Sequence, residues 1–181
     1  YLGRSRIDIN PFDKTALVWG HSHLFEKNLI GSLKYFYRRL KDYQLNIVRC
    51  SAYNLSNPAL DQYLKIKNSK KIKFLIGYTS CIKRLSERIL ESDVIYNFDH
   101  IKSIVITAEN ADDNDIEVIE RAFKSKCHIE YGTAEAGVLG YSSNPDKYIH
   151  LFWDDYIYQT SSTNNLIITS IYERYFPLIR Y

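Results

Sequence analysis

A short apolar run followed by a helical pattern recurs four times before Tyr131, and this alternation constrains the fold more than any other feature. The strand-like runs lie at Thr15–Trp19, 45–50, 71–78, 101–109 and 126–131. Parallel strands need long crossover connections, usually helices, whereas antiparallel neighbours can be joined by tight turns. The alternation therefore predicts an α/β fold with a mostly parallel sheet and helices on both of its faces.

The intervening segments have the spacing of amphipathic helices, at 23–43, 58–66, 81–92 and 114–125. Leu29, Leu33, Phe36 and Leu40 recur at helical intervals, which predicts a buried apolar stripe. Asp112 or Asp113 is expected to cap the last of these helices.

The texture of the sequence changes after Glu135. Strand-like segments follow one another at 136–142, 148–155, 156–160 and 165–172, without a helical pattern between them. Consecutive strands of this kind pair antiparallel. We expect residues 1–142 to form an α/β part that binds nucleotide and substrate, and residues 143–181 to form an antiparallel β portion.

Composition excludes several classes of protein. The 24 basic and 21 acidic residues give a net charge of +3, too balanced to indicate a nucleic-acid partner. The 16 tyrosines and eight phenylalanines do not alternate with basic residues, and we expect most of them to pack in the core. No run approaches the roughly 18 apolar residues of a membrane helix. The three cysteines, without metal-ligand spacing, predict reduced thiols in a cytoplasmic protein.

Three strand ends carry polar or glycine-containing segments, at 77–80, 107–110 and 131–135. In a parallel sheet these ends open on one edge, where ligands of α/β proteins bind. In the last segment Tyr131 offers a ring for base stacking, and Gly132 allows close approach of a ligand. Thr133 could bind phosphate, and Glu135 has the hard oxygen that Mg²⁺ prefers. A turn with an exposed Glu135 and a core Tyr131 is the alternative.

Four segments, in order, resemble motifs of the adenylate-forming enzymes that activate carboxylic acids with ATP. The segment IEYGTAEAGVLGYS resembles the family's Y-G-x-T/S-E motif, and IKSIVITAENADDNDIEVIERAF resembles the strand, G-A-E-x-L segment and helix before it. IGYTSCIKRLSERI is similar to the G-Y-P-S segment, and NLIITSIYERYFPLIRY to the stretch ending in P-L-I-R-Y. The ending resembles the phenylacetate–CoA ligase branch, which includes relatives from capsular polysaccharide biosynthesis. The match covers roughly residues 70–181.

The resemblance implies a role for each matching residue. Glu135 would hold the Mg²⁺ that bridges the ATP phosphates and would be the catalytic residue. The nucleotide would be bound by Tyr131, Gly132, Thr133, Ala134, Ala108, Glu109 and Asn110, and the acid by His21, Gly77, Tyr78 and Ser80. ATP and Mg²⁺ are the implied cofactors, CoA or another molecule the acceptor, and a small carboxylic acid the substrate.

The chain also departs from the family pattern. Ala134 stands where the family has a hydroxyl residue before the glutamate. The Ser/Thr/Gly-rich phosphate loop, the T-G-D stretch and the C-terminal domain with its catalytic lysine are absent from these 181 residues. We therefore expect an internal fragment of a longer enzyme, inactive by itself. A non-catalytic α/β binding or assembly domain derived from the family, or a nucleotide-binding regulatory domain, is the alternative.

Three of the proposed residues have a second reading as helix caps. Ser80 could be the N-cap of the helix after it, and Glu109 could cap the next helix instead of contacting a ligand. His21 or Ser22 could be the N-cap of the helix at 23–43. His21 and His23 could instead face one side and bind a metal, although no third ligand follows at a suitable spacing.

Overall fold

The computed structural model describes residues 7, 9–10, 12–20, 29–69, 72–142, 148–172 and 178–180, with the side chains of 29–33, 66–69 and 178–180 left out. By its contacts the chain forms two compact units, Tyr1–Ile129 and Glu130–Tyr181. His21 and the cap at residues 21–22 lie outside the described residues. The functional division at residue 142 stays a prediction.

The first unit has the alternation that the sequence predicts. In chain order its elements are β1 (Thr15–Trp19), α2 (Leu29–Gln44), β2 (Ile47–Ser51), α3 (Asn57–Ser69), β3 (Phe74–Tyr78), α4 (Thr79–Glu91), β4 (Ser103–Thr107), α5 (Asp113–Phe123) and the start of β5 (Lys126–Thr133). The strands β2, β1, β3 and β4 are neighbours in that order, and all three pairings are parallel. The predicted α/β fold with a mostly parallel sheet is confirmed.

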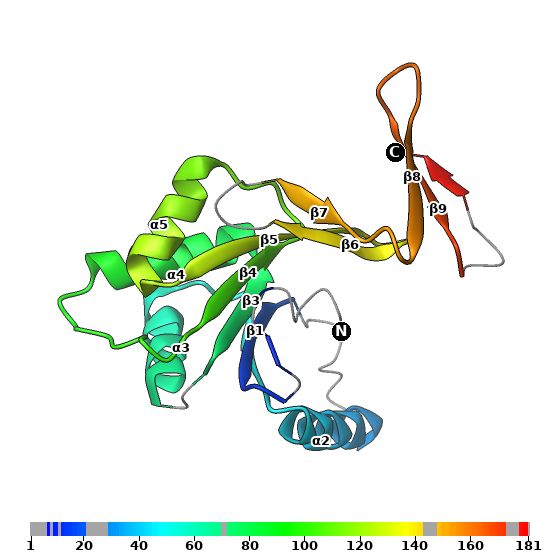
Figure 1. The fold of residues 1–181 in the computed structure, drawn as a ribbon. Helices are drawn as coiled ribbons and strands as arrows, with labels where there is room; N and C mark the ends of the chain where they lie inside the picture. Colours follow the sequence, from blue (N-terminus) through cyan, green and yellow to red (C-terminus); the bar gives the residue numbers. More distant parts are fainter. Residues whose placement is uncertain are drawn as a thin grey trace. The chain divides into compact units, whose positions relative to one another are not determined.

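The direction of the strand order reverses between β1 and β3. From β1 the chain moves outward to β2, and from β3 it moves the opposite way to β4. With right-handed crossovers, such a reversal places α2 on one face and α3 to α5 on the other. Figure 1 shows this arrangement, and α4 packs against both α3 and α5. The carboxyl ends of β1 and β3 therefore flank a topological switch point, where ligands of such sheets bind.

The core of this unit lies between the sheet and its helices. The largest fully buried side chains include Phe74, Leu75, Ile104, Ile82 and Phe123, from strands β3 and β4 and helices α4 and α5. Strands covered on both faces are apolar throughout. This is why SIVIT of β4 is buried at all five positions and FLIGY of β3 at four of its five.

Helix α2 corrects one expectation from the sequence. Phe36 and Leu40, which we expected in a buried stripe, are 67% and 47% exposed. The opposite side of the helix carries Arg38 and Asp42, which are half-buried. Asp42 forms a bidentate ion pair with Arg49 of β2, at 2.6 and 2.8 Å. This pair joins the half-buried side of α2 to β2, and Phe36 and Leu40 lie on the exposed side.

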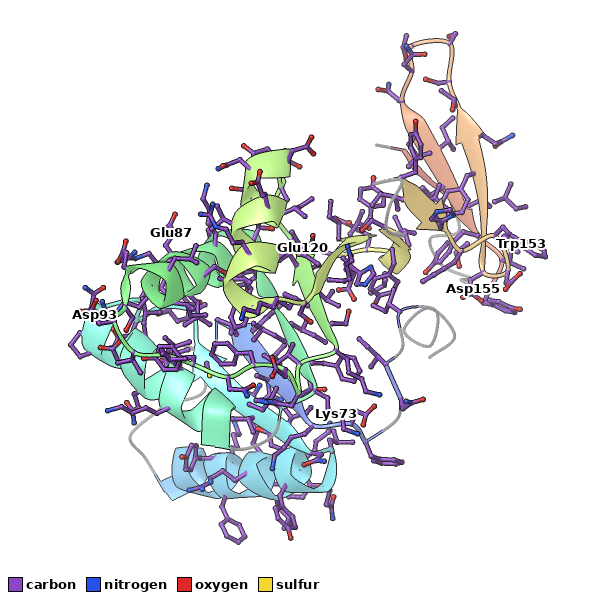
Figure 2. The ribbon with its side chains drawn as sticks, turned by 60° about the vertical axis from the view of Figure 1, so that its left-hand side comes forward. Lys73, Glu87, Asp93, Glu120, Trp153 and Asp155 are labelled. Carbon is purple, nitrogen blue, oxygen red and sulfur yellow. The ribbon has the colours of Figure 1, made fainter. Side chains whose placement is uncertain are left out.

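The second unit is antiparallel. The end of β5 pairs with β6 (Gly137–Ser142), and β6 pairs with β7 (Ile149–Leu151). A separate three-stranded sheet contains β8 (Tyr156–Thr160), β9 (Leu166–Ser170) and β10 (Leu178–Arg180), in the order β10-β9-β8. Trp153, at the β7–β8 connection labelled in Figure 2, is exposed. The predicted antiparallel portion is confirmed, and antiparallel pairing already includes Glu130–Thr133 at the end of β5.

Two ion pairs connect the helices that cover the sheet. Lys83 of α4 binds Asp115 of α5 at 2.5 Å, and Arg88 of α4 binds Asp61 of α3 at 2.8 Å. Asp112 caps α5 as predicted, in a capping box with Asp115. The ion pairs fix α4 against its neighbours, and the helix begins at the carboxyl end of β3.

We predict that Asp115 makes stability depend on pH at the acid end. The hydrogen bond from Lys83 lowers the pKa of Asp115 below its ordinary value of 3.8. A folded-state pKa below the unfolded one gives stability that is fully present above the unfolded pKa and is lost as pH falls through the folded pKa. Urea unfolding should therefore show Asp115→Asn well below the wild type at neutral pH, with the gap closing as the pH falls through the folded-state pKa of Asp115. A gap independent of pH would contradict the prediction.

Candidate functional site

The carboxyl ends of β1 and β3 carry a pair of aromatic rings. Trp19 ends β1 and Tyr78 ends β3, and their ring centroids are 4.5 Å apart with planes inclined by 30°. Both side chains are half-buried, so one part of each ring is open to a ligand. A planar apolar surface at a switch point suits an apolar or aromatic group. The sequence reasoning found Tyr78 but missed Trp19, although its place at the end of the first strand was a usable signal.

Two glycines at this edge permit close packing. A Cβ on Gly77 would come within 2.7 Å of the Val18 carbonyl oxygen, so the close approach of β3 to β1 requires a glycine there. A Cβ on Gly20 would come within 2.7 Å of the Tyr53 hydroxyl. Gly77 was predicted to border the acid pocket, and the structure gives it a packing reason as well.

Glu109 binds the first turn of α4. Its carboxylate accepts the backbone N–H of Ser80 at 2.7 Å and the Ser80 hydroxyl at 3.1 Å. The Thr79 hydroxyl also donates to the Glu109 carbonyl, at 3.3 Å. The first N–H groups of a helix have no partner within the helix and attract negative charge. Glu109 therefore joins the β4–α5 loop to the start of α4.

This arrangement corrects two of the predicted caps. Ser80 is not the N-cap of α4, because Tyr78 holds that position without a side-chain cap bond. Glu109 does not cap the next helix, since Asp112 caps α5; it binds the preceding helix α4 instead. Sequence distance hides this contact, because the two residues are 29 positions apart.

The loop that carries Glu109 begins with an unusual backbone conformation. Ala108 has a φ of +65°, in the left-handed region that residues with a side chain seldom adopt. Such residues cost on the order of 1–3 kcal/mol and gather at functional sites. Ala108, Glu109 and Asn110 are all exposed. The strained turn leads directly into the residue that binds α4.

The surroundings of the Cys81 thiol, next to Ser80, make it unreactive. Burial raises the pKa of the Cys81 thiol, and the nearby Glu109 carboxylate raises it further. Cys127 is more deeply buried and its pKa is raised to about 12. All three cysteines are free and buried. A thiol kept protonated is a poor nucleophile, so Cys81 contributes packing.

In the second unit the segment from Tyr131 to Glu135 forms one side of a β-hairpin. Strand β5 continues to Thr133, which pairs with Gly137 of β6 across a three-residue turn. Gly137 has a φ of +75°, the left-handed residue that closes hairpins of this length. Two-residue hairpin loops favour Asn-Gly or Asp-Gly, but this three-residue turn does not require either dipeptide. The register shifts between Tyr131 and Gly132.

The residues of the proposed nucleotide segment have distinct surroundings. Tyr131 is half-buried, and Ala134 and Glu135 are exposed in the turn. A Cβ on Gly132 would come within 2.5 Å of the Gly137 carbonyl oxygen, so the hairpin requires a glycine there. The Thr133 hydroxyl accepts the N–H of Ala136 at 3.0 Å. The structure thus brings this segment together on one turn, with Glu135 near its tip.

Metal binding by the protein alone has no support in the described part of the chain. No group of three or more His, Cys, Asp or Glu side chains there could hold a metal ion. An exposed carboxylate such as Glu135 still fits Mg²⁺ that arrives on a nucleotide, since Mg²⁺ is commonly held by one or two carboxylates together with substrate phosphates. No helix among the described residues is long and apolar enough to cross a membrane.

We predict that Glu109 stabilises α4 mainly through an acceptor oxygen. Removing a helix cap costs roughly 0.5–2 kcal/mol, so Glu109→Ala should lower the free energy of unfolding by about 1 kcal/mol. Glu109→Gln keeps an oxygen for the Ser80 N–H and should restore more than half of the loss. Urea unfolding measures both variants, with the exposed neighbour Asn110→Ala as the control. Equal stability of Glu109→Ala and wild type would show that the contact of Glu109 with Ser80 does not stabilise α4.

Comparisons with known proteins found relatives by sequence and by fold. No family model matches the sequence. The chain is 29% identical over 117 residues to the indoleacetate–lysine synthetase of Pseudomonas savastanoi, covering 63% of this chain and 29% of that protein. It is 28% identical over 152 residues to protein CapK of Staphylococcus aureus, covering 82% and 33%. The chain thus spans about a third of the length of these curated relatives.

A solved structure shows the same fold. It is the 2-hydroxyisobutyryl-CoA ligase in complex with 2-HIB-AMP and CoA, with a TM-score of 0.64 and 14% identity. The match covers 90% of this chain and 37% of the ligase. Together with the two sequence relatives, this fold confirms the resemblance stated from the motifs.

Proposed function

We propose that this chain, whose fold and relatives are those of the adenylate-forming superfamily, acts within an enzyme that activates a carboxylic acid with ATP. A carboxylate oxygen attacks the α-phosphorus, the bond from that phosphorus to pyrophosphate breaks, and an acyl-adenylate forms. The acyl group then passes to the thiol of CoA or to another nucleophile, and AMP leaves. The observation that carries the proposal is the shared fold with a ligase that was solved with 2-HIB-AMP and CoA.

The segment from Tyr131 to Glu135 would form part of the nucleotide site. The half-buried ring of Tyr131 offers a face for adenine, and the exposed Gly132 beside it allows the close approach of Gly137 across the hairpin. Thr133 and Ala134 lead into the turn that presents Glu135. Mg²⁺ held by Glu135 would neutralise charge on the triphosphate and so favour departure of pyrophosphate. Glu135 acts in this proposal as a metal ligand and not as an acid or base.

The first unit would bind the acid. The tilted rings of Trp19 and Tyr78 lie at the switch point, where they offer an apolar surface to the apolar part of an acid. The contact between Glu109 and Ser80 holds the neighbouring loop in place. Ala108, Glu109 and Asn110 of that loop are proposed, from the resemblance, to bind the nucleotide, and His21 to bind the acid. Binding that fixes the carboxylate in line with the phosphorus accounts for much of such a rate enhancement.

The setting follows from the same resemblance. Relatives of this branch belong to capsular polysaccharide biosynthesis, so a carbohydrate pathway is the proposed context. The cytoplasm is the proposed compartment, since buried free thiols remain reduced there. The phosphate loop, the ribose aspartate and the catalytic lysine of the family have no counterpart in these 181 residues. The activity is therefore to be tested in the complete gene product.

One observation favours a second candidate, a binding or assembly domain without catalysis. The Thr133 hydroxyl is engaged by Ala136 within the turn, and Ala134 supplies no hydroxyl where the family has one. Loss of a phosphate contact would weaken the chemistry while the fold persists. Absence of acid-dependent exchange between ATP and pyrophosphate, across a panel of acids, would favour this candidate over the ligase.

We predict that Glu135→Gln abolishes adenylation. The amide keeps the size of the side chain and removes its charge, so the Mg²⁺–triphosphate contact is lost. Pyrophosphate exchange in the complete protein should fall by about 100-fold or more, the scale reported for loss of one electrostatic contact in a transition state. The exposed Glu117→Gln on α5 is the matched control, and circular dichroism checks folding. Exchange at the wild-type rate in Glu135→Gln would remove the assignment.

We predict that Trp19 reports binding of the acid. The chain contains two tryptophans, so Trp153→Phe leaves Trp19 as the only fluorophore of this kind within the 181 residues. Phenylacetate, added as a probe to the complete protein with that substitution, should change the Trp19 emission, and acetate should change it much less. The same titration of the double variant, Trp153→Phe with Trp19→Phe, measures any emission change that comes from other parts of the protein. Equal signals with and without Trp19 would exclude the aromatic surface.

A further inference from the structure

The turn that carries Glu135 is held by hydrogen bonds on both sides of one residue. Ala136 follows Glu135 directly, and its N–H is accepted by the Thr133 hydroxyl at 3.0 Å. Its carbonyl oxygen accepts the hydroxyl of Tyr156, from the first residue of β8. The first of these bonds is local, whereas the second comes from 20 positions along the chain and from the other sheet of the unit.

A second tyrosine on β8 makes a similar contact further from the turn. Tyr158 lies two residues after Tyr156 and therefore on the same face of the strand. Its hydroxyl donates to the carbonyl of Leu139 in β6, at 3.2 Å. The two rings have their centroids 6.1 Å apart. One face of β8 thus binds the hairpin at two points, of which Tyr156 reaches the turn itself.

The hydroxyls remain donors at physiological pH. Burial raises the pKa of Tyr156, and the Asp155 carboxylate raises it further. Burial also raises the pKa of Tyr158, to about 12. Protonated hydroxyls can donate without competition from an ionised form.

We infer that Tyr156 is a positioning residue for Glu135: its hydroxyl fixes the Ala136 carbonyl and thereby the backbone of the turn that presents the carboxylate. Ala134 and Glu135 are exposed in this turn, so burial does not fix their backbone. Fixing the peptide on the carboxyl side of Glu135 limits the directions that its side chain can take. A metal–nucleotide complex then meets a preorganised carboxylate and loses less entropy on binding. This inference rests on the proposed role of Glu135.

Removal of the Tyr156 hydroxyl separates its role from that of the ring. Tyr156→Phe keeps the ring and its packing and loses the bond to Ala136. Tyr158→Phe is the matched control, because it removes the same group from the same face of the same strand but releases Leu139. Amide hydrogen exchange should rise at residues 134–137 in Tyr156→Phe, by about 10-fold or more, and stay near wild type there in Tyr158→Phe.

The functional test is a double-mutant cycle on the affinity of the complete protein for Mg·ATP, measured by calorimetry. Tyr156→Phe should weaken binding by about 5- to 10-fold in the wild-type background. In the Glu135→Gln background it should weaken binding less than 2-fold, because a residue that acts through Glu135 has nothing left to position. A merely structural role would give the same loss in both backgrounds.

The outcomes distinguish the two proposals. Unchanged exchange at residues 134–137 in Tyr156→Phe would overturn the positioning role, whatever the nucleotide affinity. Increased exchange with equal losses of affinity in the two backgrounds would also overturn it. Increased exchange together with a Glu135→Gln variant that binds Mg·ATP as the wild type does would instead refute the proposed role of Glu135, while the contact of Tyr156 with the turn would stand.

Discussion

The parallel pairing of β3 with β1 on one side and β4 on the other is the constraint on which the rest of the first unit depends. It requires strands that are apolar on both faces, and it requires Gly77 where β1 approaches most closely. It also brings the ends of these strands to one edge. The rings of Trp19 and Tyr78 meet at that edge. Glu109, which follows β4, binds Ser80 there.

Polar side chains hold the loops in both units, by contacts that are distant in sequence. A carboxylate binds the start of α4 in the first unit, and a tyrosine hydroxyl binds the hairpin turn in the second. Each contact satisfies a backbone group that the local secondary structure leaves without a partner. The loops proposed to meet substrate are therefore fixed by side chains from neighbouring elements, while the apolar core fixes only the elements themselves.

Most elements of the fold could be predicted from the sequence, because hydrophobic periodicity records which residues each strand or helix buries. The strand at Thr15–Trp19 and the cap at Asp112 are confirmed. Helix α2 shows the limit of that reasoning: the helix forms where its spacing predicts, but Phe36 and Leu40 are exposed while Asp42 on the other side binds Arg49 of β2. Periodicity shows which residues share one side of a helix. Which side faces the sheet depends on the residues that the sheet offers as partners.

The sequence by itself determined the fold class, the order of elements and the segments proposed for chemistry, since each depends on residues that are close in the chain. Only the tertiary structure decided the strand order, the switch point beside Trp19, the helix that Glu109 binds and the bond from Tyr156 to Ala136. These features join residues 20 or more positions apart. No local pattern records such pairs, because hydrogen-bond geometry and ring stacking depend on how the packed elements meet.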